Sequence, residues 1–280
     1  NPNMMRTLKK DGFYPTIFTN TALNRDTNEP WWEGMDGTVP KNLIDWQGKP
    51  WDCTSDAKAA HPNSRFTVSM YNAPTLSKEA DNPKGVPISA MIFGGKRTKL
   101  IPLVFESFNW PNGVFAAARM GSETTAAAAH QVGVLRRDPM AMLPFCGYSM
   151  GDYFAHWLNI GKRMTKPPKI FSVNWFRQDD SGSFMWPGFG DNIRVFEWII
   201  KRVKGNAKGR HTPIGIVPNL EELDLTGLNI GEENMKKLFE VNTEDWKNEL
   251  EDVKIFLRQF ADKMPEEMWQ QYKDLETQLS

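Results

Sequence analysis

The sequence predicts an α/β fold, in which a mixed sheet has flanking helices and the chain ends in a helical tail. The first observation is a set of segments rich in β-branched and aromatic residues, at 85–95, 99–107 and 168–176. The second is a pair of amphipathic segments, 151–163 and 193–203, whose apolar residues recur three and four positions apart. The third is the helical pattern of residues 232–280.

Composition limits the partners. With 280 residues, 40% of them hydrophobic, the chain can bury a core as one large domain or two small ones. Lys plus Arg and Asp plus Glu number 34 each, so no overall charge draws it to nucleic acid or to a membrane surface. Two cysteines and no long apolar run favour a soluble protein of a reducing compartment. Because the sequence opens at Asn1 without an initiator Met, we expect a fragment of a longer protein.

The first half of the chain is expected to be mostly strands and loops. Residues 1–60 alternate short apolar pieces with Asn, Asp, Gly and Pro, which is typical of short strands. The strands expected at 85–95 and 99–107 are separated by GGKRT, which predicts a hairpin or a tight crossing. Residues 113–119, GVFAAAR, are interpreted as a third strand. The segment 120–133 is either a short Ala-rich helix or a mobile lid, because it has glycines near both ends and no large apolar anchor before Val132.

Turns and helix ends are also readable in the second half. DDSGS (179–183) predicts a turn followed by a short return strand at 184–186. Asp191 or Asn192 is expected to cap the helix that follows. Thr243 is expected to cap a later helix, and Pro265 to open the last one.

Residues 174–192, NWFRQDDSGSFMWPGFGDN, crowd aromatic side chains around turns rather than along a regular element. A purine has two π-faces and a hydrogen-bonding edge, so rings can hold its faces while an amide reads its edge. Phe176, Phe184 and Phe189 would form such a slot, with Asn192 as the reader. The alternative is that the rings only pack beneath a hairpin, and the pattern alone favours that alternative.

Two further segments suit anions. Asn63 and Arg65, within HPNSRF, would point to the same side of an extended segment and could grip a carboxylate or phosphate. In FGGKR (93–97), two glycines precede two cations, and Lys96 or Arg97 could neutralise an anion that approaches the backbone. For HPNSRF, the pattern alone favours an ordinary surface loop, and FGGKR by itself is weak evidence because many hairpins end in Gly-Gly-Lys. No G-x-x-x-x-G-K-[ST] motif and no metal-ligand spacing of histidines occurs, so the sequence contains no complete catalytic centre by itself.

Taken in order, these motifs resemble one family. HPNSRF, FGGKR, SETTAAAAH, DPMAMLPF and NWFRQDDSGSFMWPGFGDN are similar to segments of GTP-dependent phosphoenolpyruvate carboxykinase, and the similarity runs over the whole chain. The resemblance implies that residues 1–280 are the C-terminal part of the nucleotide-binding catalytic domain. The N-terminal domain, the P-loop and the manganese ligands would then lie outside this chain, and the chain alone is expected to be inactive.

The resemblance also implies roles for individual residues. The guanine pocket would span 174–192 and comprise Trp175, Phe176, Phe184, Phe189, Gly190, Asp191 and Asn192, with Trp175 and Trp186 beside the base. Substrate would contact Asn63, Ser64 and Arg65, and Arg65 would also act catalytically and, with Lys96, on the nucleotide. An Ω-loop lid would cover 121–133 and include Ser122, Glu123, Thr124, Thr125, Ala126 and His130. No metal ligand is expected within the chain.

The reaction so implied is oxaloacetate plus GTP giving phosphoenolpyruvate, CO2 and GDP, a step of gluconeogenesis. GTP and GDP would be the nucleotide substrates, with Mn²⁺ and Mg²⁺ in the full-length enzyme. A monomer is implied, with the cytoplasm as its expected location and the mitochondrion left open.

Two departures keep another interpretation open. Lys96 and Gly121 stand where the family pattern has arginines, and an ammonium cannot copy the two-pronged contact of a guanidinium. The alternative is therefore a diverged relative that holds guanine nucleotide but transfers phosphoryl groups poorly. A Trp-rich carbohydrate-binding protein is a third hypothesis, which the low cysteine count and the lack of a signal peptide disfavour.

Overall fold

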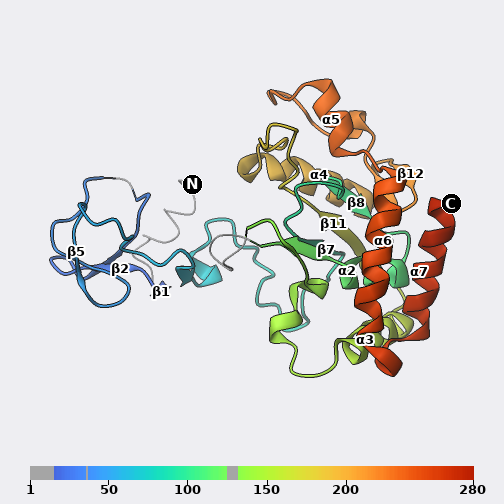
Figure 1. The fold of residues 1–280 in the computed structure, drawn as a ribbon, viewed down its shortest axis with the longest axis horizontal. Helices are drawn as coiled ribbons and strands as arrows, with labels where there is room; N and C mark the ends of the chain where they lie inside the picture. The colour runs from blue at the N-terminus through green and yellow to red at the C-terminus, as the bar shows by residue number, and fades with distance from the viewer. Residues whose placement is uncertain (1–15, 36, 125–131) are drawn as a thin grey trace. The chain divides into compact units, whose positions relative to one another are not determined.

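The computed structural model describes residues 16–35, 37–124 and 132–280. The described residues form two compact units, one of residues up to Pro87 and one of residues from Ile88 onward (Figure 1). Among the described residues, no helix has both the length and the apolar character that crossing a membrane would require.

The first unit is built from short strands, as its pattern predicts. A four-stranded antiparallel sheet has the order β3-β2-β4-β5, and β1 pairs with β6. The strands are β1 Ile17–Thr19, β2 Ala22–Asn24, β3 Glu29–Trp31, β4 Leu43–Ile44, β5 Pro50–Trp51 and β6 Arg65–Thr67. Ala22, Trp31, Leu43 and Ala59 form a small core, against which Trp51 packs. Such a small core fits strands of only two or three residues.

The second unit contains a mixed five-stranded sheet of order β12-β13-β8-β11-β7. Its strands are β7 Ala90–Gly94, β8 Val104–Glu106, β11 Lys169–Val173, β12 Arg210–Thr212 and β13 Gly215–Val217. β7 and β11 are parallel and the other pairs are antiparallel. The hairpin expected between 85–95 and 99–107 is wrong, because β11 lies between β7 and β8. The connection is instead the crossing that the sequence left open.

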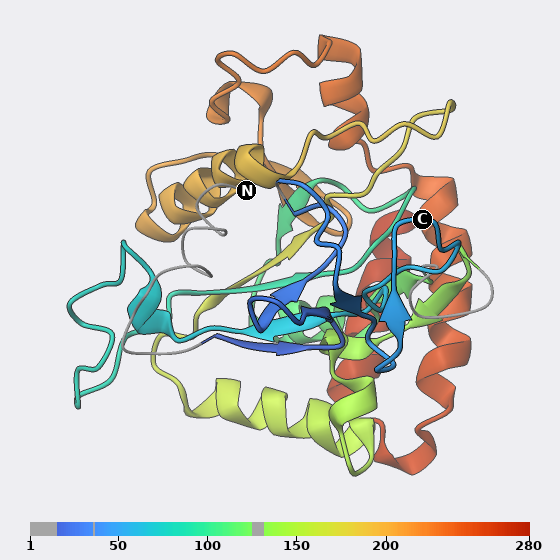
Figure 2. The ribbon, with the colours of Figure 1, turned by 90° about the vertical axis from the view of Figure 1, so that its left-hand side faces the viewer.

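Helices cover both faces of this sheet. The helices of the second unit are α2 Trp110–Ala118, α3 Met150–Arg163, α4 Asn192–Lys204, α5 Glu232–Leu238, α6 Thr243–Arg258 and α7 Glu266–Leu279. On β11, Ile170 lies against Gly113 of α2, whereas the neighbouring Phe171 packs edge-to-face on Trp198 of α4 at 6.0 Å. Successive strand residues point to opposite faces, so α2 and α4 cover opposite sides. Figures 1 and 2 show α3 and α4 on opposite sides as well.

The strand predicted at 113–119 is wrong, since these residues belong mostly to α2. Asn109 caps the helix by accepting a hydrogen bond from the Asn112 N–H at 3.0 Å, and a proline stands in the first turn. Three consecutive alanines favour a helix. Gly113 allows close packing, because a Cβ there would lie 2.6 Å from the side chain of Ile170.

The predicted helices are present, and their ends differ in detail. Asn242, not Thr243, caps α6 by accepting from the Asp245 N–H at 3.1 Å. Asp191 precedes α4, but its carboxylate binds Arg194 instead of the helix N-terminus. The return strand expected at 184–186 is reduced to one bridge, between Gln178 and Phe184.

Candidate functional site

The candidate site of the second unit lies where β7 and β11 end. These strands are parallel and in register, with Gly94 opposite Val173. The segments that follow, 95–98 and 174–178, therefore leave the sheet at the same edge. Ligands of α/β folds bind outside the carboxyl ends of parallel strands, because loops diverge there. Two segments chosen from sequence for separate reasons thus become neighbours.

Asn174 joins these two segments, although no role was expected for it from the sequence. Its buried side-chain amide donates to the carbonyl oxygens of Arg97 at 2.8 Å and Ile101 at 3.0 Å. Its Oδ1 accepts from the N–H groups of Arg97 at 3.3 Å and Phe176 at 3.2 Å. An asparagine directly after a buried strand is the signal that could have identified it.

Three aromatic rings stand at the surface of residues 174–192. Phe176 and Phe184 meet edge-to-face at 6.0 Å and are 36% and 55% exposed. Phe189 is 70% exposed and has a φ of 51°, an uncommon backbone conformation for a bulky residue. These rings are not packed beneath a hairpin. Trp175 is half-buried and packs edge-to-face on Phe196 at 6.2 Å.

The turn between Phe176 and Phe184 is held by one carboxylate. Asp179 accepts from the N–H groups of Ser181 at 2.9 Å and Ser183 at 3.0 Å, and from the Ser181 hydroxyl at 2.6 Å. These hydrogen bonds lower the pKa of Asp179, and the one from the Ser181 side chain has the largest effect. The turn fixes the position of the ring that follows it.

Trp186 supports the site from inside the protein. Its ring is fully buried, so the expectation that it lies beside a base is wrong. Its Nε1–H donates to Oδ1 of Asn192 at 2.8 Å. This bond fixes the orientation of the amide and directs the Asn192 NH2 group away from Trp186. The physical reason for the burial is the large apolar surface of the indole, which the core takes up.

Gly190 and Asp191 lie beside a different hollow. Together with residues of α4, they line an open groove of about 800 Å³. Arg194 donates to Asp191 Oδ1 at 3.0 Å and so holds this carboxylate at the groove's edge. Phe176, Phe184 and Asn192 are not among the residues that line this groove.

Lys96 stands between the aromatic rings and the strand that leads into 125–131. Its Nζ lies 5.8 Å from the ring centre of Phe176, and its N–H donates to Ser122 Oγ at 3.0 Å. Its carbonyl accepts from the Glu123 N–H at 2.8 Å. The Glu123 carboxylate in turn accepts from the N–H and hydroxyl of Thr98, at 2.8 and 3.0 Å.

The predicted lid is only partly described. β9 Gly121–Glu123 pairs antiparallel with β10 Leu135–Arg137, and the Thr124 N–H donates to the Val134 carbonyl at 2.9 Å. Ser122, Glu123 and Thr124 therefore lie in or beside a two-stranded arm. Thr125, Ala126 and His130 fall outside the described residues.

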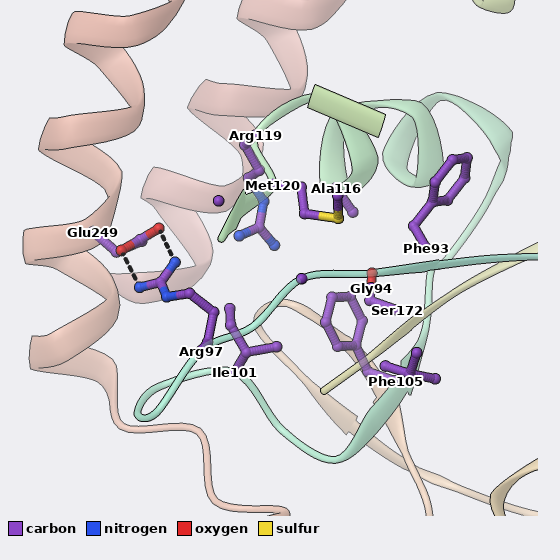
Figure 3. A pocket seen from close by; sticks show the side chains of 13 residues that line it. Phe93, Gly94, Arg97, Ile101, Phe105, Ala116, Arg119, Met120, Ser172 and Glu249 are labelled. Carbon is purple, nitrogen blue, oxygen red and sulfur yellow. Dashed lines mark hydrogen bonds and ion pairs between the residues drawn. The ribbon is translucent and has the colours of Figure 1, made fainter. Parts of the chain in front are cut away.

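Arg97, next to Lys96, is an anchor in the protein interior. Its guanidinium binds Glu249 of α6 through two hydrogen bonds, at 3.0 and 2.8 Å (Figure 3). Arg137 of β10 donates to the same carboxylate at 2.7 Å. Burial opposes the charge of Glu249, but the two arginines outweigh it and lower the pKa to about 2. The Glu249 carboxylate therefore connects α6 to the glycine-rich segment FGGKR (93–97) and to the two-stranded arm of β9 and β10.

In the first unit, the structure brings Asn63 and Arg65 together. Arg65 Nε donates to Asn63 Oδ1 at 3.3 Å. The extended geometry expected for them is wrong, because Asn63 lies in a turn before β6. The ring of His61 maintains that turn, since its Nδ1 accepts from the Asn63 N–H at 2.9 Å. Asn63 and Arg65 are exposed, and Ser64 is half-buried between them.

A metal site was not expected within the chain. Among the residues that the structure describes, no three His, Cys, Asp or Glu side chains gather closely enough to hold a metal ion.

Comparisons with known proteins agree with the resemblance. Residues 1–278 match the family described as phosphoenolpyruvate carboxykinase C-terminal P-loop domain. Relatives named phosphoenolpyruvate carboxykinase [GTP] include that of Anaeromyxobacter dehalogenans strain 2CP-1, 50% identical over 95% of this chain and 44% of its own length. Those of Chlamydia muridarum and Renibacterium salmoninarum are 45% and 48% identical, each over all of this chain and 46% of their own length. The chain spans less than half the length of these relatives. It belongs to the family of the phosphoenolpyruvate carboxykinase C-terminal P-loop domain.

Proposed function

We propose that this chain is the C-terminal part of a GTP-dependent phosphoenolpyruvate carboxykinase and provides its guanine pocket. The full-length enzyme would convert oxaloacetate and GTP to phosphoenolpyruvate, CO2 and GDP. The names and identities of the relatives support this over a diverged relative that only binds nucleotide. The phosphoenolpyruvate carboxykinase C-terminal fold, ending in the helical tail, is part of the proposal.

The observation that most directly supports this proposal is a pair of exposed rings, Phe176 and Phe184, beside the cation Lys96. They lie where the parallel strands β7 and β11 end. Phe176 and Phe184 offer apolar faces to a base, and stacking contributes about 1–3 kcal/mol per base. Lys96, 5.8 Å from Phe176, would neutralise the nucleotide's phosphates. Because Asn174 fixes both segments, the rings and the cation keep their spacing before any ligand arrives.

Asn192 would select guanine. Its Oδ1 already accepts from Trp186, so its NH2 group is the part that remains to read a base. Guanine presents the acceptor O6 at the position where adenine presents a donor amino group. With Oδ1 engaged by Trp186, the amide presents its NH2 group and so favours guanine, since adenine would leave two donors facing each other.

The chemistry would proceed in two steps. Oxaloacetate loses CO2 and keeps the bonding electron pair as an enolate, whose oxygen then attacks the γ-phosphorus of GTP and releases GDP. Asn63, Ser64 and Arg65 would bind substrate, with Arg65 and Lys96 neutralising charge on the transferred group. Mn²⁺ and Mg²⁺ belong to the proposal for the full-length enzyme only. The segment 121–133 would be the lid that excludes water.

A tryptophan-fluorescence titration with GDP, and with ADP as control, tests the pocket. Trp175 adjoins the rings and should report occupancy by a saturable change in emission that GDP causes and ADP does not. Phe184→Ala should weaken binding about 5- to 100-fold, as expected for a lost stacking face. The proposal fails if neither this chain, shown to be folded by circular dichroism, nor its full-length parent distinguishes GDP from ADP.

A further inference from the structure

A small cavity lies inside the second unit, behind the glycine-rich segment. Its volume is about 30 Å³, and its walls include Gly95, Arg97, Arg119, Gly121 and Glu249 (Figure 3). A cavity needs roughly 10–15 Å³ to hold one water-sized particle. The space therefore suits a single small occupant and is too small for a nucleotide.

Arg119 is the unexplained group at this cavity. It follows α2, is only 5% exposed, and its Nε has no hydrogen-bond partner among the described residues. Its guanidinium lies 4.5 Å from the centre of the Trp246 ring, a contact that leaves the Nε–H without an acceptor. Burial lowers the pKa of Arg119 to about 10, yet the group stays charged at neutral pH. A buried cation with unused donors is costly unless a ligand accepts its hydrogen bonds.

The surrounding charges favour an anion over water. Glu249 is the acidic group that acts on Arg119, and it already binds Arg97 and Arg137. Arg137 also pairs with the exposed Asp252. Three guanidiniums therefore face two carboxylates, and one monovalent anion would balance the remaining charge.

We propose that this cavity binds one spherical monovalent anion of chloride size, with the N–H groups of Arg119 as donors. The glycine backbone makes the walls close: a Cβ on Gly95 would lie 2.5 Å from the Gly121 carbonyl oxygen. The anion would sit behind the segment that carries Lys96 and would stiffen it from inside.

Two measurements on this chain without nucleotide test the site, so that its failure is separate from failure of the guanine pocket. Crystals grown with bromide should show an anomalous peak in the cavity. In thermal unfolding, the midpoint temperature should rise about 3–5 °C for each tenfold increase in sodium chloride concentration once the site saturates. Sodium gluconate at equal ionic strength is the control and should not produce this rise.

Arg119→Met, which keeps a long side chain over Trp246, should abolish the chloride-specific rise. Arg163→Met, at an exposed position in the last turn of α3, should retain it. The proposal is overturned by bromide crystals without a peak in the cavity, or by a chloride-specific rise that persists in Arg119→Met. It is equally overturned if Arg119 is found bonded to Asp138, whose Oδ1 is also buried without a partner among the described residues.

Discussion

Replacing Glu249 by glutamine should destabilise the second unit strongly. The carboxylate is 8% exposed and receives hydrogen bonds from Arg97 at 3.0 and 2.8 Å and from Arg137 at 2.7 Å. A glutamine keeps one acceptor oxygen but turns an NH2 group toward a guanidinium, and it removes the charge that offsets Arg97, Arg119 and Arg137. Breaking a buried ion pair on one side costs about 3–5 kcal/mol. That loss is a large part of the roughly 5–15 kcal/mol by which a domain is stable.

Urea unfolding followed by near-ultraviolet circular dichroism measures this loss, because the fully buried Trp246 lies against Arg119, one of the charged cluster of Glu249, Arg97, Arg119 and Arg137. Glu251→Gln is the matched control on the same helix, since Glu251 is exposed and pairs with Lys254 only at 3.7 Å. The control should change the unfolding free energy by less than about 1 kcal/mol. Equal stabilities of Glu249→Gln and Glu251→Gln would refute the argument that one carboxylate holds the cluster together.

Three further results are expected. The contribution of Glu249 to stability, about 3 kcal/mol, should be lost as pH falls from 5 to 2, because the pKa of Glu249 is near 4.5 in the unfolded state and about 2 in the folded state. In a pH series of urea melts, the loss between pH 5 and pH 2 should be smaller by this amount in Glu249→Gln. Gly95→Ala should weaken GDP binding measured by calorimetry, because the new Cβ would lie 2.5 Å from the Gly121 carbonyl oxygen. Gly147→Ala is the control and should leave GDP binding unchanged, since a Cβ at Gly147 would meet open space. Asn174→Asp should lower both the melting temperature and GDP affinity, because a carboxylate cannot donate to the two carbonyls that the amide binds; unchanged values would contradict its joining role.

Local pattern predicted much of the secondary structure. The helices at 150–163 and 192–204 follow from apolar residues at helical spacing, and the turn at 179–183 follows from its Asp, Ser and Gly content. The same reasoning failed at 113–119, where Val and Phe suggested a strand. The cap at Asn109 and the alanines favoured helix, and packing of Gly113 on Ile170 completed it.

The motifs, their family resemblance and the side chains available for a base and for anions can all be identified from the order of the residues alone. Tertiary structure decided which of them meet. The parallel pairing of β7 and β11 brings Lys96 close to Phe176, although about 80 residues separate them along the chain. The partner of Arg97 lies 152 residues away, so no local pattern could show that this arginine is buried while the neighbouring lysine faces the rings. Hydrophobic periodicity acts over a few residues, whereas strand order and burial depend on contacts across the entire unit.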